Sequence, residues 1–195
     1  MFPLVISFYT KDTPYQLDAH HLTASCQKFG IEHHIEGINS YGSWELNCAF
    51  KPFFIAEKLM AFKRPVLWVD VDAVFVQKPK SLKVFEKDFA VYSQADLSYD
   101  HPSKVRSGTV FINHTERGFH FLKTWAQECQ TLLVDPTRTE EFWDQIALRN
   151  VYLSQKKNLG RLPLSYIKIL GHPVDVKCPN PVIIHCQASR HAKKG

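Results

Sequence analysis

A short run of apolar residues followed by two aspartates places the strongest constraint on the fold. Residues 66–69 are apolar at every position, and Asp70 and Asp72 follow them directly. A run of this length without polar alternation is typical of a strand that is covered on both faces. Unpaired carboxylates are costly to remove from water. The segment therefore predicts an inner strand that delivers two acidic side chains to the edge of a covered sheet.

Strand-like and helix-like segments alternate along the chain. We expect strands at residues 4–9, 31–38, 66–69, 89–92, 109–112 and 181–184, and helices from about 14 to 30, 52 to 62, 116 to 133 and 139 to 150. Asp12 or Thr13 is the expected cap of the first helix and Thr139 that of the last. This alternation predicts an α/β fold with a mostly parallel central sheet flanked by helices.

Ligands of such sheets bind at the carboxyl ends of the strands. Three groups of polar residues fall at these ends, namely Tyr9 with Thr10, Asp70 with Asp72, and His185. Hard carboxylate oxygens suit Mg²⁺ or Mn²⁺, which also bind diphosphates. A structural turn or helix cap is the alternative role for the two aspartates.

The composition limits the classes of protein to consider. The chain has 195 residues, of which 45% are hydrophobic, and this suits one domain with one core. No apolar run approaches the roughly 18–20 residues that span a bilayer, and residues 2–8 lack the features of a signal peptide. The net charge is +5, without a basic helix interleaved with aromatics, so we expect no nucleic-acid partner. Five widely spaced cysteines indicate reduced thiols and a cytoplasmic protein.

Four segments, in this order, resemble those of the GT-A glycosyltransferases, which are Rossmann-like nucleotide-diphospho-sugar transferases with a DXD motif. They are Lys51-Pro52 with the following helix and residues 66–72, then residues 106–113, 143–148 and 183–190. The resemblance implies a Rossmann-like GT-A fold and a metal-dependent transferase of hexosyl type. Its donor would be a nucleoside diphosphate sugar, with a UDP-sugar favoured, and its acceptor an unidentified glycan, lipid or protein. Donor binding would fall in residues 1–115, and residues 116–195 would complete the acceptor and metal sites.

The resemblance also implies roles for individual residues. Asp70, Asp72 and His185 would hold the divalent metal, Mn²⁺ or Mg²⁺, and Asp144 and Gln145 would be the catalytic pair beside the transferred sugar. The remaining residues would contact the donor: Tyr9 and Thr10 at the base and ribose, Asp70 near the ribose, Lys51, and Arg190 or Lys193 at the diphosphate.

Two other functions fit parts of the sequence. A haloacid-dehalogenase-like phosphatase would use Asp70 as nucleophile and Asp72 as acid and base. The strand–helix–strand unit that precedes these residues, and the absence of a late acidic pair, count against it. A non-catalytic nucleotide-sugar-binding domain is the other alternative. For a transferase, retention or inversion stays open, with Asp144, Asp96 or Asp100 as the candidate base of an inverting enzyme.

Overall fold

The computed structural model describes residues 2–80, 83–138, 142–155, 159–172, 175–176 and 178–187. The elements in chain order are β1 (Leu4–Thr10), α1 (Tyr15–Lys28), β2 (His33–Ile38), α2 (Trp44–Ala49), α3 (Lys51–Phe62), β3 (Val66–Val69), β4 (Ala73–Phe75), β5 (Phe89–Ser93), β6 (Val105–Ile112), α4 (Glu116–Val134), α5 (Asp144–Ser154), β7 (Leu159–Arg161), β8 (Lys168–Ile169) and β9 (Ile183–His185). Short 3₁₀ turns lie at Lys83–Glu86 and Leu164–Tyr166.

The central sheet has six strands in the order β2-β1-β3-β6-β5-β7. β1 runs parallel to both β2 and β3, and β7 runs parallel to β5. β6 is antiparallel to both of its neighbours, β3 and β5. The predicted mostly parallel α/β sheet is thus confirmed, with β6 as the reversed strand. β3 lies inside the sheet and all four of its residues are buried, as the apolar run predicts.

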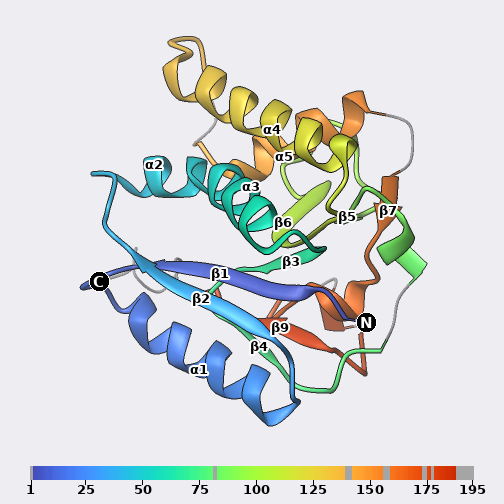
Figure 1. Ribbon diagram of the computed structural model, residues 1–195. Coiled ribbons are helices and arrows are strands. Elements are labelled where there is room, and N and C mark those ends of the chain that lie inside the picture. Colours follow the sequence, from blue (N-terminus) through green and yellow to red (C-terminus); the bar gives the residue numbers. More distant parts are fainter. Residues whose placement is uncertain are drawn as a thin grey trace.

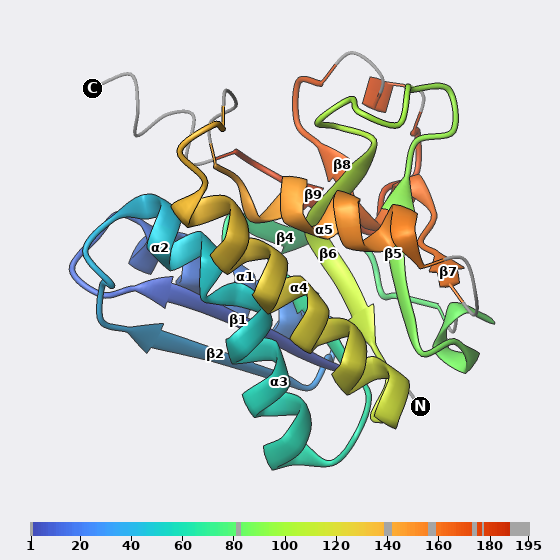
Figure 2. The same ribbon diagram turned by 90° about the horizontal axis from the view of Figure 1, so that it is seen from above.

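Alternating side chains of the inner strands face two separate cores, which gives the molecule its layers. Ile6 and Trp68 pack on one face against α3, α4 and α5. Val5 and Leu67 face the opposite side, where α1 packs beside a second sheet of order β4-β9-β8. Figure 1 shows α3, α4 and α5 on one side of the sheet and α1 with β4 and β9 on the other, and Figure 2 shows the same layers from above.

The predicted start of the last helix is wrong. α5 begins at Asp144 rather than at Thr139, and the residue before it is an extended Trp143 without a side-chain cap bond. Phe142, which is buried in the core, is not helical, so the chain enters α5 through packing and not through a hydroxyl cap. Residues 139–141 themselves lie outside the described residues.

The first helix also lacks its predicted cap. α1 begins at Tyr15, and Pro14 precedes it without a side-chain cap bond. The Thr13 hydroxyl instead donates a hydrogen bond of 2.6 Å back to the carbonyl of Thr10, and Asp12 takes a left-handed φ of 58°. The Thr13 hydroxyl and the Asp12 backbone are therefore part of the turn that follows β1, and neither residue caps the helix.

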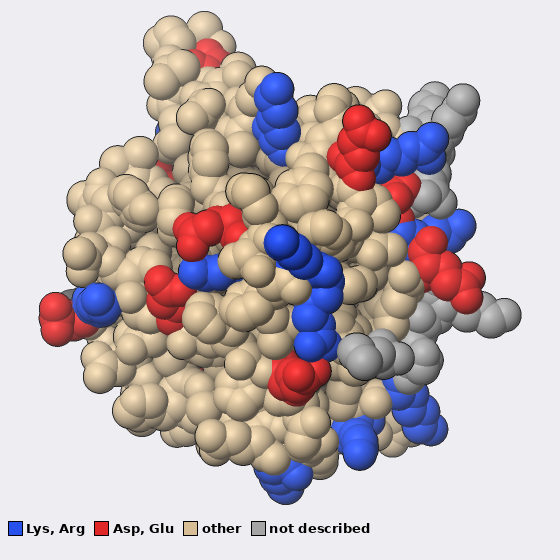
Figure 3. Space-filling view, viewed as in Figure 1, with Lys and Arg blue, Asp and Glu red and all other residues tan. Residues whose placement is uncertain are grey.

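The surface shows no dominant patch of one charge on the face in Figure 3. Among the residues described there, Lys and Arg side chains are interspersed with Asp and Glu. No helix in the described part of the chain has the length and apolar character needed to cross a membrane.

Candidate active site

Three residues whose side chains can bind a metal ion lie close together where β3, β4 and β9 meet. Asp70 and Asp72 follow β3, and β4 then pairs antiparallel with β9 so that Ala73 lies opposite His185. The Cys186 amide donates to the Asp72 carbonyl at 2.9 Å, which holds this turn against the end of β9. One ligand atom from each of the two aspartates and His185 lies within 4.8 Å of the others. The sequence separates His185 from the two aspartates by more than a hundred positions, and the second sheet brings them together.

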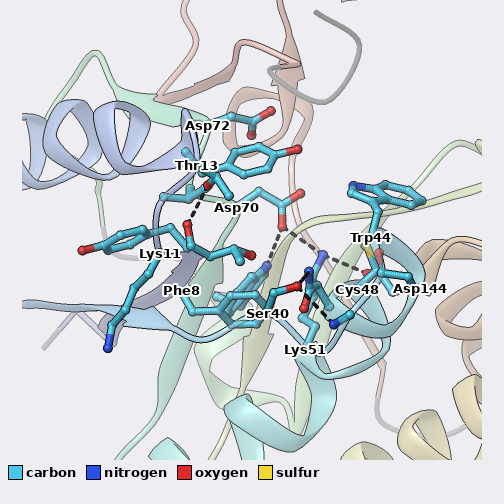
Figure 4. A pocket seen from close by; sticks show the side chains of 18 residues that line it. Phe8, Lys11, Thr13, Ser40, Trp44, Cys48, Lys51, Asp70, Asp72 and Asp144 are labelled. Carbon is cyan, nitrogen blue, oxygen red and sulfur yellow. Dashed lines mark hydrogen bonds and ion pairs between the residues drawn. The ribbon is translucent and has the colours of Figure 1, made fainter. Parts of the chain in front are cut away.

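Lys51 connects this cluster to Asp144. Its ammonium lies 2.9 Å from Asp70 Oδ1 and 2.8 Å from Asp144 Oδ2, between the two carboxylates in Figure 4. The side chain of Lys51 is 7% exposed and that of Asp144 8%. The indole N–H of Trp68 also donates to Asp70 Oδ1, at 2.8 Å. These contacts fix the orientation of the Asp70 carboxylate before any ligand binds.

Burial and charge shift the pKa values of this group in predictable directions. Burial raises the pKa of Asp144, and the Lys51 charge opposes this shift. For Lys51, burial alone would lower the pKa, but the charges of Asp144 and Asp70 outweigh it and the pKa is raised. Lys51 is therefore a permanent cation between its two partners.

Two cavities meet at these acidic residues. The first, of about 440 Å³, is lined by the end of β1 and by the segment around the start of α2. The second, of about 330 Å³, is lined by the start of β6, the start of α5 and β8. Four residues line both cavities, namely Trp44, Asp70, Asp72 and Asp144. A ligand that occupies both cavities would lie against these four residues.

The other residues predicted from the sequence take different places. Tyr9 and Thr10 line the first cavity. Gln145 lines the second, but its amide is already engaged with the backbone. Its Nε2 donates to the Pro102 carbonyl at 2.9 Å, and its Oε1 accepts from the Ser107 amide at 3.2 Å. Arg190 and Lys193 lie outside the described residues.

The sequence reasoning missed two aromatic residues at the first cavity. Trp44 and Tyr15 both line it. Figure 4 shows Trp44 beside Asp144 and Cys48 at the edge of this cavity. For Trp44, the signal available in the sequence was a tryptophan at the end of a mostly polar turn.

Arg106 is a further residue that the prediction assigned no role. It is 2% exposed, it lines the second cavity, and its Nη1 lies 2.7 Å from Asp175 Oδ2. The guanidinium also lies over the Tyr92 ring at 5.2 Å. A basic residue in an apolar strand was the signal for such a buried pair, but nothing local in the sequence identifies Asp175 as its partner.

Comparison with known proteins places this geometry in a family. The model of the nucleotide-diphospho-sugar transferases matches residues 51–194. The fold is similar to that of a glycosyltransferase involved in the glycosylation of the major capsid of PBCV-1. The TM-score is 0.71 at 15% identity, over 100% of this chain and 97% of that one. No curated protein sequence matches the chain.

Two further solved structures share the fold. The glycosyltransferase GlyE of Streptococcus pneumoniae TIGR4 has a TM-score of 0.60 at 16% identity, over 94% of this chain and 54% of that chain. The galactosyltransferase LgtC, solved with donor and acceptor sugar analogues, has a TM-score of 0.55 at 11% identity, over 94% of this chain and 87% of that chain. The family match covers more than half of the chain, and the chain therefore belongs to the nucleotide-diphospho-sugar transferases and is a glycosyltransferase of the GT-A type.

Proposed function

We propose that the protein transfers a sugar from a nucleoside diphosphate sugar to an acceptor hydroxyl, with a divalent cation held by Asp70, Asp72 and His185. The observation that carries the proposal is the position of this cluster at the junction of two cavities. A donor diphosphate at the junction would leave the first cavity for the nucleoside and the second for the sugar and the acceptor. A UDP-sugar is the favoured donor.

The chemistry of the three side chains fits such a cation. Two carboxylates and one imidazole suit Mn²⁺ and Mg²⁺. The ligand atoms are close enough to share one ion, because all lie within 4.8 Å of one another. When bound, the ion would neutralise charge that develops on the diphosphate leaving group. The family membership and this mixed ligand set favour transfer over the phosphatase alternative.

The remaining residues divide between the two cavities. Tyr9 and Thr10 line the first cavity at the end of β1. Their position there supports the proposal that residues 1–115 bind the nucleoside. Asp144 lines both cavities and is ion-paired with Lys51. Its carboxylate would accept hydrogen bonds from the hydroxyls of the transferred sugar. The engaged amide of Gln145 supports a positioning role, in which it holds residues 102 and 107 around the second cavity.

Titration calorimetry with UDP and with GDP, each with Mn²⁺ and with a chelator, tests the donor site. We expect one nucleotide to bind only in the presence of Mn²⁺. Asp72→Asn should abolish this binding while leaving the melting temperature unchanged within a few degrees. Glu57→Gln is the matched control, because this carboxylate pairs with Lys58 on α3, is 61% exposed and is not a member of the proposed metal cluster. Nucleotide binding that ignores both the chelator and Asp72→Asn would overturn the metal site.

Turnover separates a transferase from a domain that only binds nucleotide sugars. We expect slow, metal-dependent hydrolysis of the donor sugar even without an acceptor. Asp144→Asn should lower the rate of this hydrolysis more than it lowers donor affinity, because the carboxylate is proposed to act on the sugar. A large loss of affinity with a normal rate would contradict that role. Binding without any hydrolysis or transfer would favour the non-catalytic alternative.

The five free thiols support a reducing compartment, and we propose a cytoplasmic location on that basis. The expected partners are the donor and a glycan, lipid or protein acceptor. An acceptor screen with the donor identified by calorimetry decides among these three classes.

A further inference from the structure

We propose that Gly108 and Thr109, two consecutive residues of β6, are positioning residues that present His185 Nδ1 to the divalent cation. The inference rests on the proposed metal site and names two residues that would not touch the ion themselves. Thr109 acts through a hydrogen bond to the imidazole, and Gly108 acts by leaving space for it.

The hydrogen bonds of Thr109 determine which ring nitrogen of His185 carries a proton. The Thr109 hydroxyl, which is fully buried, donates to the Tyr166 carbonyl at 2.8 Å. The same oxygen lies 3.0 Å from His185 Nε2. A hydroxyl has a single proton to donate. Because that proton is directed to Tyr166, the oxygen accepts from Nε2–H, and the neutral ring keeps its lone pair on Nδ1.

That lone pair lies on the side of the ring that faces Asp72. His185 Nδ1 and Asp72 Oδ1 are 3.9 Å apart, which is too long for a direct hydrogen bond. Two ligands of one small divalent ion, each at about 2.1 Å from it, are separated by about 3–4 Å. The spacing therefore fits two ligands around a shared ion better than it fits a hydrogen-bonded pair.

Gly108 makes this ring position sterically possible. A Cβ atom at residue 108 would lie 2.9 Å from His185 Cε1 and 3.0 Å from Nδ1, on the edge of the ring that carries the lone pair. Gly108 is not among the residues with positive φ, so its backbone conformation does not require glycine. The requirement comes from the imidazole, because a Cβ atom this close would force the ring or its surroundings to shift.

The same segment of β6 also holds Asp70. The Asp70 amide donates to the Gly108 carbonyl at 2.8 Å, and Thr109 pairs with Val69 across β3 and β6. Two neighbouring residues thus fix one carboxylate ligand through the backbone and the imidazole ligand through a side chain. A hydrogen bond to the distal nitrogen of a metal-binding histidine typically contributes a factor of 10–100 in metal affinity.

Mn²⁺ binding without donor, measured from the electron paramagnetic resonance signal of free Mn²⁺, tests the inference. Thr109→Val keeps the shape and removes the hydroxyl, and we expect it to weaken Mn²⁺ binding about 10–100-fold. Thr109→Ser restores the hydroxyl and should return the affinity close to the wild-type value. Gly108→Ala should weaken binding at least as much as Thr109→Val. Thr124→Val is the control, because its hydroxyl bonds a carbonyl on the exposed face of α4 at 3.0 Å.

Nitrogen-15 NMR of the histidine ring supplies a readout that does not depend on the variants folding. In the wild type, with the ring neutral and no metal present, we expect the proton of His185 on Nε2. A proton on Nδ1 would overturn the inference, as would equal Mn²⁺ affinities of the wild type and Thr109→Val. Failure of Thr109→Ser to restore binding would assign the effect to packing and would also overturn it. If the wild type itself takes up no Mn²⁺, the cation of the proposed function is wrong as well.

Discussion

Two lysines of α3 provide a test of how far burial, rather than charge pairing alone, determines the stability of the site. Lys51 and Lys58 each pair with two carboxylates and each lie over an aromatic ring. The two lysines differ in how far the side chains of their partners are exposed to water. Asp144, beside Lys51, has an 8% exposed side chain, whereas Glu36 and Glu57, beside Lys58, are 41% and 61% exposed. Replacing each lysine by methionine therefore removes the same group from two different environments.

The expected magnitudes follow from what each substitution leaves behind. Lys51→Met leaves the Asp144 carboxylate buried without its cation, and breaking a buried pair in this way costs about 3–5 kcal/mol. Lys58→Met leaves two carboxylates that water can solvate, and exposed pairs contribute about 0.2–1 kcal/mol each. Methionine retains most of the packing of the lysine stem, so the difference between the two variants reports the uncompensated charge.

Urea unfolding followed by circular dichroism measures both variants. For a chain of this length, 1 kcal/mol corresponds to about 2–4 °C in melting temperature, so the loss at Lys51 is visible in thermal melts as well. Raising the salt concentration should reduce the effect of Lys58→Met but not that of Lys51→Met, because salt screens exposed pairs much more than buried ones. Free energies of unfolding that differ by less than about 1 kcal/mol between the variants would refute the reasoning.

Three further predictions concern other parts of the molecule. Asp175→Ala strands the buried Arg106 guanidinium and should cost about 3–5 kcal/mol in urea unfolding, whereas Arg106→Met with Asp175→Leu should recover most of that loss. Trp44→Phe should reduce the change in tryptophan fluorescence on binding of nucleotide and Mn²⁺, because Trp44 lines both cavities; an undiminished change would contradict contact between Trp44 and the ligand. Burial raises the pKa of Cys26 to about 12, so iodoacetamide at neutral pH should label it only after unfolding, as mass spectrometry can show. Because this folded-state pKa lies above the unfolded one, the protonated thiol stabilises the fold below about pH 9, and this contribution declines as the pH rises toward 12.

The layered α/β architecture was predictable because its signals are local. Residues 66–69 are buried at every position, as their uninterrupted apolar run indicates. α4 begins at Glu116 after a Thr115 cap and ends within a residue of the predicted boundary. β4, β8 and β9 are two or three residues long, which is too short for a pattern of alternation to be recognised. β9 was anticipated by the strand predicted at residues 181–184, but its pairing with β4 and β8, which brings His185 to Asp72, was not.

The site was predictable to the extent that its residues follow strands. Asp70 and Asp72 could be selected from the cost of burying charge, and His185 from the resemblance to a family. The pairing of Lys51 with Asp144 could not be predicted, because Asp144 lies 93 positions away and the 2.8 Å contact depends on how α3 and α5 both pack against α4. Arg106 and Asp175 illustrate the same limit, since the buried pair joins a strand to a distant turn.

The reversed direction of β6 explains most of what the sequence did not reveal about the site. Parallel strands present their carboxyl ends at the ligand edge of the sheet, and a search of the residues that follow strands finds those positions. Because β6 runs antiparallel to β3, its own first half lies at that edge. Three successive residues there each bond a different segment of the site: the Ser107 amide bonds Gln145, the Gly108 carbonyl bonds the Asp70 amide, and Thr109 bonds His185.

This arrangement gives β6 a different role from that of the strands around it. α5, the turn after β3 and β9 supply members of the site, and three successive residues of β6 connect them. A one-residue change in the register of β6 would separate the three contacts together and would turn each side chain to the opposite face of the sheet. A change in the turn that follows β3 would act on the two aspartates instead. The geometry of the candidate metal site therefore depends most on a strand whose side chains are not proposed to bind the metal.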